Sequence, residues 1–207
     1  MIDFFEYYQQ KGHVFGECMS HPDCDLMYIH IPKNASSWTK PNLKHFDWQF
    51  YNYHLDNLYH KHAMIVLRDP IERWLSGISE YMHLYHRKLD TAHLSNNFFD
   101  LVFDRIAFDD HTDSQVLFLQ NINLNNCTFF LCNENYKHNF SKFLTEHEMP
   151  NPYYKYDNQN VTSDNPEKLQ IKNIFSKALD NSKYKYKVEQ YFKKDYNLIN
   201  SVKFYAR

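Results

Sequence analysis

Three short runs of apolar, β-prone residues are spaced along the chain, and each is typical of a buried strand. They are residues 27–31 (MYIHI), 62–67 (HAMIVL) and 127–132 (CTFFLC). The first run stops at Pro32. Continuous apolar runs of this length, bounded by turn residues, predict strands that are covered on both faces.

A helix is predicted directly after the second run. Apolar residues recur at three- and four-residue steps over residues 71–85, which indicates a single apolar face. Asp69 suits the N-cap, Pro70 suits the first helical position, and Glu72 follows the cap at the spacing of a capping box. The strand that ends at residue 67 is therefore expected to lead at once into a helix.

The rest of the chain continues this alternation. Further helices are expected at residues 98–108, 114–120, 166–179 and 183–199, and a long loop rich in Pro, Asn and Asp at residues 149–165. Strands that alternate with helices predict an α/β domain with a mainly parallel sheet. No internal repeat or linker interrupts the pattern, so residues 1–207 are expected to form a single domain.

The composition is that of an ordinary globular protein, but it excludes two kinds of nucleotide site. The 207 residues carry 23 Lys and Arg against 25 Asp and Glu, and the net charge of −2 argues against a surface devoted to nucleic acid. The three glycines, at positions 12, 16 and 77, fit neither G-x-G-x-x-G nor G-x-x-x-x-G-K-[ST]. Any phosphate-binding loop must therefore be built without the usual glycines.

Neither a membrane segment nor a targeting signal is evident. The apolar runs are far shorter than the roughly 20 residues of a membrane helix, and residues 1–12 (MIDFFEYYQQKG) are acidic and aromatic. We therefore expect a cytoplasmic protein. The cysteines stand at positions 18, 24, 127 and 132. They form no C-x-x-C pair and are expected to be reduced, partly buried thiols, and the Cys and His spacings match no standard zinc site, so no metal is expected.

Candidate chemistry first appears in residues 28–39 (YIHIPKNASSWT). The pattern is a strand, a tight turn that carries Lys33, and small hydroxyl residues that open a helix. Backbone N–H groups at a helix start bind anions, and the hydroxyls of Ser36 and Ser37 add donors. Ala35 is small enough for a ligand to approach the backbone. The segment therefore predicts an oxyanion site with Lys33 beside it.

Residues 67–81 (LRDPIERWLSGISEY) show the same pattern, in which a strand end is followed by a basic residue and a helix start. Arg68 follows a strand end, and Ser76 lies on the second turn of the capped helix. Both segments come at the carboxyl ends of strands, where ligands bind in open α/β sheets. Two separate anion sites on neighbouring strands predict a ligand that carries phosphates at both ends.

The two segments resemble motifs of a known family. I-P-K-N-A-S-S-W (residues 31–38) resembles the 5′-phosphosulfate loop of sulfotransferases, and R-D-P-I-E-R-W-L-S (residues 68–76) resembles their 3′-phosphate motif. The chain is similar to carbohydrate sulfotransferases, including the heparan sulfate 2-O-sulfotransferase type and small microbial or viral proteins of that group. Weaker similarities lie at residues 110–115 (DHTDSQ), an H-x-x-x-Q element, and at residues 130–135 (FLCNEN), a strand that ends in Glu-Asn.

The resemblance implies a three-layer, P-loop-NTPase-like α/β fold and the donor 3′-phosphoadenosine 5′-phosphosulfate (PAPS), with no metal. By position, Arg68 and Ser76 would hold the 3′-phosphate. The 5′-phosphosulfate would be held by Lys33, Asn34, Ala35, Ser36, Ser37 and Trp38. The family also has a flexible late loop, which we expect at residues 149–165.

The chemistry of sulfuryl transfer assigns further roles. The transition state of an in-line transfer is loose and its charge dispersed, so positioning and electrostatics dominate. Lys33 would neutralise charge on the bridging oxygen of the leaving phosphate. A histidine suits the general base because its pKa lies near neutrality. His54 is the first candidate, because residues 48–54 (WQFYNYH) alternate like the strand that carries the base in the resembled family; His45 and His111 follow.

Simpler interpretations remain open for each segment. Lys33 and the two serines fit an ordinary capped turn, and Arg68 with Asp69 fits a structural ion pair. His54 fits a satisfied surface histidine, and His111 fits a helix cap. The alternating lysines and tyrosines of residues 183–187 (KYKYK) are typical of nucleic-acid binders, but on an amphipathic helix they favour a solvated face.

The predicted function is transfer of a sulfuryl group from PAPS to a hydroxyl of a small molecule or glycan, with a carbohydrate expected and with no nucleic acid or membrane as partner. One alternative is a P-loop-type nucleotide-dependent phosphotransferase, which is weakened because no G-K-[ST] follows the strand. Another is a non-catalytic nucleotide-binding module. The sequence specifies neither the acceptor nor the oligomeric state.

Overall fold

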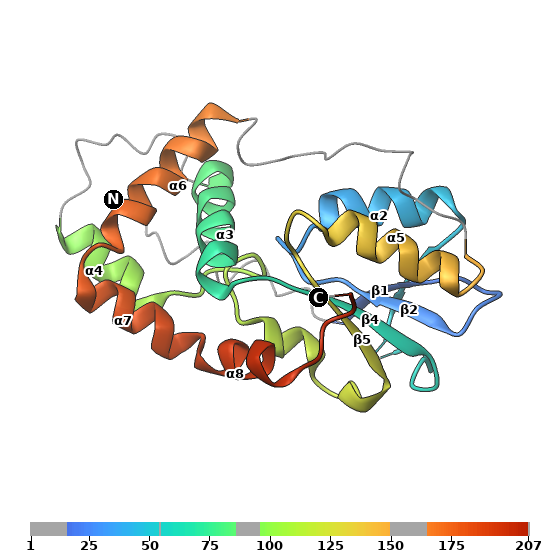
Figure 1. Ribbon diagram of the computed structural model, residues 1–207. Coiled ribbons are helices and arrows are strands. Elements are labelled where there is room, and N and C mark those ends of the chain that lie inside the picture. Colours follow the sequence, from blue (N-terminus) through green and yellow to red (C-terminus); the bar gives the residue numbers. More distant parts are fainter. Residues whose placement is uncertain (1–15, 54, 86–95, 150–164, 207) are drawn as a thin grey trace. The chain divides into compact units, whose positions relative to one another are not determined.

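The computed structural model describes residues 16–53, 55–85, 96–149 and 165–206 (Figure 1). These residues form two compact units. Within the described ranges, the sheet unit consists of residues 16–69, 115–149 and 198–206, and the helical unit of residues 70–114 and 165–197. The chain passes repeatedly between the two units, so neither is a continuous segment.

The described part of the sheet unit contains a five-stranded sheet in the order β3-β1-β2-β4-β5. The strands are β1 (Glu17–Ser20), β2 (Leu26–Ile29), β3 (Gln49–Asn52), β4 (His62–Leu67) and β5 (Cys127–Leu131). β2, β4 and β5 run parallel, whereas β1 is antiparallel to both β2 and β3. The sheet is therefore mixed, and the prediction of a mainly parallel sheet is wrong. The reason is the connection of residues 21–25 between β1 and β2, which is too short for the crossover that parallel neighbours need.

Both faces of the central strands are covered, because successive residues of a strand point to opposite sides. Among the described residues, this unit also contains α2 (Ser36–His45), α5 (Tyr136–Glu146), the 3₁₀ turns η2 (Gln115–Leu119) and η3 (Leu124–Asn126), and the end of α8 (Lys193–Ser201). Tyr28 packs with Trp38 and Phe140 on the face that α2 and α5 cover side by side (Figure 1). Ile29, the next residue of β2, packs on the other face with Phe118 of η2.

The helical unit is held together by an aromatic core. Its elements are α3 (Pro70–Tyr85), α4 (Asn96–Arg105), α6 (Pro166–Ala178), α7 (Ser182–Tyr191) and the first residues of α8 (Lys193–Ser201). The ring of Trp74 in α3 lies 5.5 Å from that of Phe103 and 5.9 Å from that of Phe175, between ring centres. Phe103 in turn stacks on Tyr184 at 4.4 Å. The apolar face that the sequence predicts for α3 is therefore buried against three other helices.

Two lysines of the KYKYK run form ion pairs with α4. Lys183 lies 2.8 Å from the carboxylate of Asp100, and Lys187 forms an ion pair with Asp104. Both acids belong to α4, one helical turn apart. These two lysines therefore join α7 to α4.

The predicted α/β class is confirmed, and several elements have the predicted bounds. β4 and α3 match, and β2 and β5 differ from the prediction by at most two residues. Residues 114–120 form the 3₁₀ turn η2 instead of an α-helix, and residues 183–199 divide into α7 and α8 at Phe192, whose backbone leaves the helical conformation. The predicted loop at residues 149–165 falls almost wholly outside the described residues.

Two further expectations are answered within the described residues. All four cysteines are free thiols, with Cys18 buried and the other three half-buried, as predicted. Among the helices that the structure describes, none combines the length and the apolar character needed to cross a lipid bilayer.

Candidate functional site

The candidate site lies at one edge of the sheet unit. Because β2, β4 and β5 are parallel neighbours, their carboxyl ends meet at this edge. β2 leads through the loop of residues 30–35 into α2, β4 ends at Leu67 just before Arg68, and β5 leads into α5. We call this region the carboxyl edge.

The loop before α2 has an unusual backbone. Lys33 and Ala35 both adopt positive φ values, 68° and 58°, in the left-handed region that glycine favours. Each such non-glycine residue is strained by about 1–2 kcal/mol. Left-handed residues that alternate with ordinary ones turn successive backbone N–H groups toward a common point, which is the geometry of an anion-binding nest. Lys33 and Ala35 therefore take up the left-handed conformation that glycine supplies in glycine-rich loops.

The amino end of α2 faces this loop without a capping side chain. The N-cap residue is Ala35, which makes no side-chain hydrogen bond, and the first turn contains no acidic residue. Within the helix, the N–H groups of Ser36 and Ser37 have no carbonyl four residues earlier to bond. Their partial positive charge, added to that of the helix dipole, favours an anion at this position.

Buried amides hold the loop against the end of β4. The Nδ2 atom of Asn34 donates to the carbonyl of Val66 and to Oε1 of Gln115, both at 2.7 Å. Gln115 also accepts from the backbone N–H of Arg68 at 3.0 Å and donates from Nε2 to the carbonyl of Arg68 at 2.9 Å. Asn34 and Gln115 are fully buried. Within the described residues, Oδ1 of Asn34 is a buried acceptor with no hydrogen-bond partner.

The side chain of Arg68 brings a positive charge to the carboxyl edge. The guanidinium of Arg68 donates to the carbonyl of Lys33 at 3.1 Å, so the side chain of Arg68 lies along the loop. Its charge also reaches Cys132, where it partly offsets the effect of burial, which raises the pKa of that thiol. The side chain of Arg68 and the backbone of Lys33, which the sequence places in different motifs, are thus in contact.

The amino end of α5 adds a third cation. Tyr136 bonds through its hydroxyl to Oγ1 of Thr39 at 2.7 Å, which joins the first turns of α5 and α2. Nζ of Lys137 lies 5.6 Å from the ring centre of Trp38. Sequence reasoning missed α5 and Lys137. The apolar spacing of Tyr136, Phe140 and Leu144 was the available signal for a helix after β5.

Two of the predicted donor-binding residues have buried side chains. The side chain of Trp38 is 1% exposed and packs in the core, and its backbone N–H donates to the carbonyl of Ala35 at 3.0 Å. The buried indole therefore stabilises the loop from the core side. Ser76 belongs to the helical unit, where it is buried on the second turn of α3 and its carbonyl accepts a hydrogen bond from Ser79 at 2.9 Å.

The histidines predicted as general bases lie in different parts of the structure. His54, the first candidate, lies outside the described residues. His45 is the last residue of α2 and is exposed. It is nine positions after Ser36, which corresponds to roughly 13 Å along the helix axis. That distance does not favour His45 as a base for chemistry at the loop.

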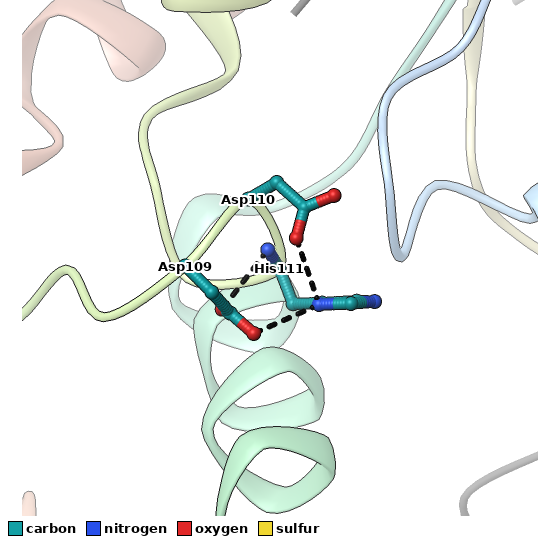
Figure 2. Close-up of side chains that lie close together, drawn as sticks. All are labelled: Asp109, Asp110 and His111. Carbon is teal, nitrogen blue, oxygen red and sulfur yellow. Dashed lines mark hydrogen bonds and ion pairs between the residues drawn. The ribbon is translucent and has the colours of Figure 1, made fainter. Parts of the chain in front are cut away.

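His111 is held between two carboxylates in the helical unit. Its Nδ1 lies 3.0 Å from Oδ2 of Asp109 and 3.1 Å from Oδ1 of Asp110, and its other ring nitrogen points away from both (Figure 2). Burial alone would lower the pKa of His111, but the hydrogen bonds and charges of Asp109 and Asp110 raise it to about 9. An imidazolium at neutral pH has no free lone pair, so this setting argues against His111 as a general base.

The segment that carries His111 is fixed by α3. The buried guanidinium of Arg73 donates to the carbonyl of Asp110 at 2.9 Å and to the carbonyl of Asp113. Gly77 lies against the same segment, since a Cβ atom there would come within 2.0 Å of the carbonyl oxygen of His111. Asp109, Asp110 and His111 also bring three possible metal-ligand atoms within 4.8 Å of one another, and an ion there would replace the Nδ1 proton.

Comparison with protein-family models, with curated proteins and with solved structures finds no match to this chain.

Proposed function

We propose that the protein is a sulfotransferase that moves a sulfuryl group from PAPS to a hydroxyl of a small molecule or glycan. The observation that carries this proposal is the loop at the carboxyl edge, where left-handed Lys33 and Ala35 precede the uncapped helix α2. Arg68 lies along the same loop. A donor with a phosphosulfate at one end and a phosphate at the other suits two cations on neighbouring strands.

Each group has a role in the proposed transfer. The N–H groups and hydroxyls of Ser36 and Ser37 bind the 5′-phosphosulfate, and Arg68 binds the 3′-phosphate. The acceptor oxygen forms a bond to sulfur while the bond from sulfur to the bridging oxygen breaks, and 3′-phosphoadenosine 5′-phosphate (PAP) leaves. Lys33 neutralises the charge that develops on that bridging oxygen. The acceptor proton passes to a general base.

We extend the proposal to the finer fold. The order strand β2, loop, helix α2, with parallel β4 beside β2, supports a P-loop-like nucleotide fold in the sheet unit. In this variant, strained non-glycine residues take the positions that glycines occupy in the usual loops. A P-loop phosphotransferase would share this arrangement, and nucleotide preference separates the two.

Calorimetric titration of the full chain with PAP tests the proposal. We expect micromolar affinity for the wild type and at least a tenfold loss in Lys33→Ala and in Arg68→Ala. Lys44→Ala is the matched control, because Lys44 is an exposed lysine in the last turn of the same helix. Folded protein that binds no PAP would overturn the proposal, and magnesium-dependent binding of ATP in preference to PAP would favour the phosphotransferase.

A further inference from the structure

A small pocket lies near the amino ends of β2 and β4, at the opposite end of these strands from the loop of Lys33. Met27 and Ala63, which pair across the two strands, both line it. They belong to the sheet face that packs against η2. Ala63 is the second residue of β4, so about 15–20 Å of strand separates the pocket from the carboxyl edge. We call it the amino-end pocket.

The pocket exists because one core position of β4 is small. Alternate residues of a strand share a face, so Ala63, Ile65 and Leu67 point to the same side of the sheet. Ile65 and Leu67 fill the core on that side, whereas Ala63 borders a cavity of about 70 Å³. A cavity of about 150 Å³ holds one benzene molecule, so this one admits a group of about three non-hydrogen atoms.

The inner wall of the amino-end pocket is apolar. Met27, Leu58 and Ala63 line it and are at most 9% exposed. The half-buried side chain of Ile122, in the turn between η2 and η3, also lines it. An apolar wall favours a methyl group over water, because burial of the methyl removes apolar surface from solvent.

The charges around the pocket do not favour an ionic ligand. Among the described residues that line it, none is acidic. The ammonium group of Lys61 already donates to the carbonyls of Cys24 at 2.5 Å and of His21 at 3.1 Å. Burial raises the pKa of Tyr53 to about 12, so its hydroxyl is neutral, and it donates to the carbonyl of Phe118 at 2.6 Å. The pocket therefore suits an uncharged group.

Two exposed amide side chains stand at the solvent side of the pocket. Asn121 and Asn123 both line it. Oδ1 of Asn123 accepts from the backbone N–H of Asn125 at 3.1 Å, which leaves the amide nitrogen to donate to a ligand. The side chain of Asn121 makes no hydrogen bond with the described residues, so it offers both a donor and an acceptor. A donor and an acceptor side by side complement another amide group.

Tyr59 adds an exposed aromatic ring at the rim. It lines the pocket and is 65% exposed, and within the described residues it contacts no other ring. Aromatic rings gain free energy when their faces are covered. A ligand that places a small group in the pocket and a larger ring outside it would cover this face.

We propose that the amino-end pocket binds the acetamido group of an N-acetylated sugar. The methyl group lies against Met27 and Ala63, the amide hydrogen-bonds with Asn121 and Asn123, and the sugar ring covers Tyr59. An acetyl group has the size that the cavity admits, and an acetamido group carries no charge. The site is separate from the carboxyl edge, so the proposal does not depend on sulfuryl transfer.

Saturation-transfer NMR of the full chain with N-acetylglucosamine tests the proposal. Little of the ligand is enclosed, so we expect an affinity in the millimolar range, with the strongest saturation at the acetyl methyl protons. Glucose, which lacks the acetamido group, should bind about tenfold more weakly or less. Glucose that binds as tightly as N-acetylglucosamine, or wild type that binds neither sugar, would overturn the proposal.

Variants place the binding in this pocket. Ala63→Val fills the cavity with a residue that suits a strand and should abolish the methyl signal. Tyr59→Ala should weaken binding about fivefold. Tyr186→Ala is the matched control, because Tyr186 is 63% exposed but belongs to α7, and it should bind like the wild type. If Ala63→Val does not fold, Asn121→Gly takes its place, since glycine accepts the φ of 67° at this exposed site.

Unchanged binding in Tyr59→Ala together with either of the other pocket variants would show that the sugar binds elsewhere. An uncharged peptide that contains Nε-acetyl-lysine tests another source of the acetamido group. It has no ring to cover Tyr59, so we expect it to bind more weakly than N-acetylglucosamine. Tighter binding of the peptide would overturn the assignment to a sugar.

Discussion

The side-chain amide of Gln115 bonds both hydrogen-bonding groups of the Arg68 backbone, accepting from its N–H at 3.0 Å and donating to its carbonyl at 2.9 Å. The same oxygen of Gln115 also accepts from Asn34 at 2.7 Å. A single buried amide thereby joins the loop before α2 to the residue after β4. The position of Arg68 along the loop depends on it.

Replacing Gln115 with Leu should therefore destabilise the sheet unit. The change leaves buried backbone groups of Arg68 without partners, and we expect a loss of about 2–4 kcal/mol in the free energy of unfolding. Urea denaturation measures this loss, and PAP affinity should fall with it. Gln120→Leu, at an exposed site just after η2, is the matched control. Equal stability of the two variants would contradict the role of Gln115.

The left-handed backbone of Ala35 limits which side chains position 35 can carry. Valine is β-branched and unfavourable at a φ of 58°, so Ala35→Val should lower stability by about 1–3 kcal/mol and abolish PAP binding. Ala35→Gly should leave stability nearly unchanged, because relief of strain is offset by the greater entropy of the unfolded glycine. Urea denaturation and calorimetry check both variants. Lys142→Val, on the exposed side of α5, provides the control for β-branching in general. A stable, PAP-binding Ala35→Val protein would show that the left-handed backbone is unimportant.

Gly77 should not accept any side chain. In most helices Gly→Ala gains about 1 kcal/mol, but here the new Cβ would overlap the carbonyl oxygen of His111 at 2.0 Å. We expect Gly77→Ala to destabilise the helical unit, with a lower urea midpoint than the wild type. Leu84→Ala, at an exposed position of the same helix, should change the midpoint far less. A gain in stability for Gly77→Ala would mean that the segment of His111 moves freely away from α3.

The environment of His111 predicts how stability varies with pH. Its pKa is about 9 in the folded protein and 6.5 in the reference state, so the folded protein binds the proton more tightly. The resulting stabilisation is complete below pH 6.5 and is lost as the pH rises through 9. Urea midpoints at several pH values should therefore fall across this interval, and His111→Gln should flatten the slope. NMR titration of the imidazole gives the folded pKa directly, and a value near 6.5 would refute the prediction.

The sequence predicts best those elements whose signals are local. Asp69, Pro70 and the apolar periodicity that follows are contained in one turn-and-helix segment, and α3 has the predicted bounds. β1 was missed because its four residues, ECMS, have neither the length nor the alternation of a recognisable strand. Missing β1 led to the wrong expectation of a mainly parallel sheet, since β1 supplies both antiparallel pairings.

For the candidate site too, features with a local sequence signal were predicted and features without one were not. Lys33 and Arg68 stand in recognisable motifs. The left-handed backbone at Ala35 has no such signal, because the residue is not glycine. At the start of the same loop, the hydrogen bond between the side chains of His30 and Glu17 joins residues 13 apart through an antiparallel contact that only β1 creates. Interactions of this kind arise from tertiary structure, so no local pattern in the sequence could have indicated them.

The bond between Arg68 and Gln115 also has a consequence for how this chain can change. Residues 70–114 leave the sheet unit just after Arg68 and return to it at Gln115, so the excursion begins and ends at two residues that touch. A segment whose ends are already held together adds closure entropy only slowly as it lengthens, about 0.6 kcal/mol for each doubling. The sheet unit therefore sets almost no limit on the size of that insertion. Residues can therefore be added between Arg68 and Gln115, in evolution or by engineering, while the loop of Lys33 keeps its supports.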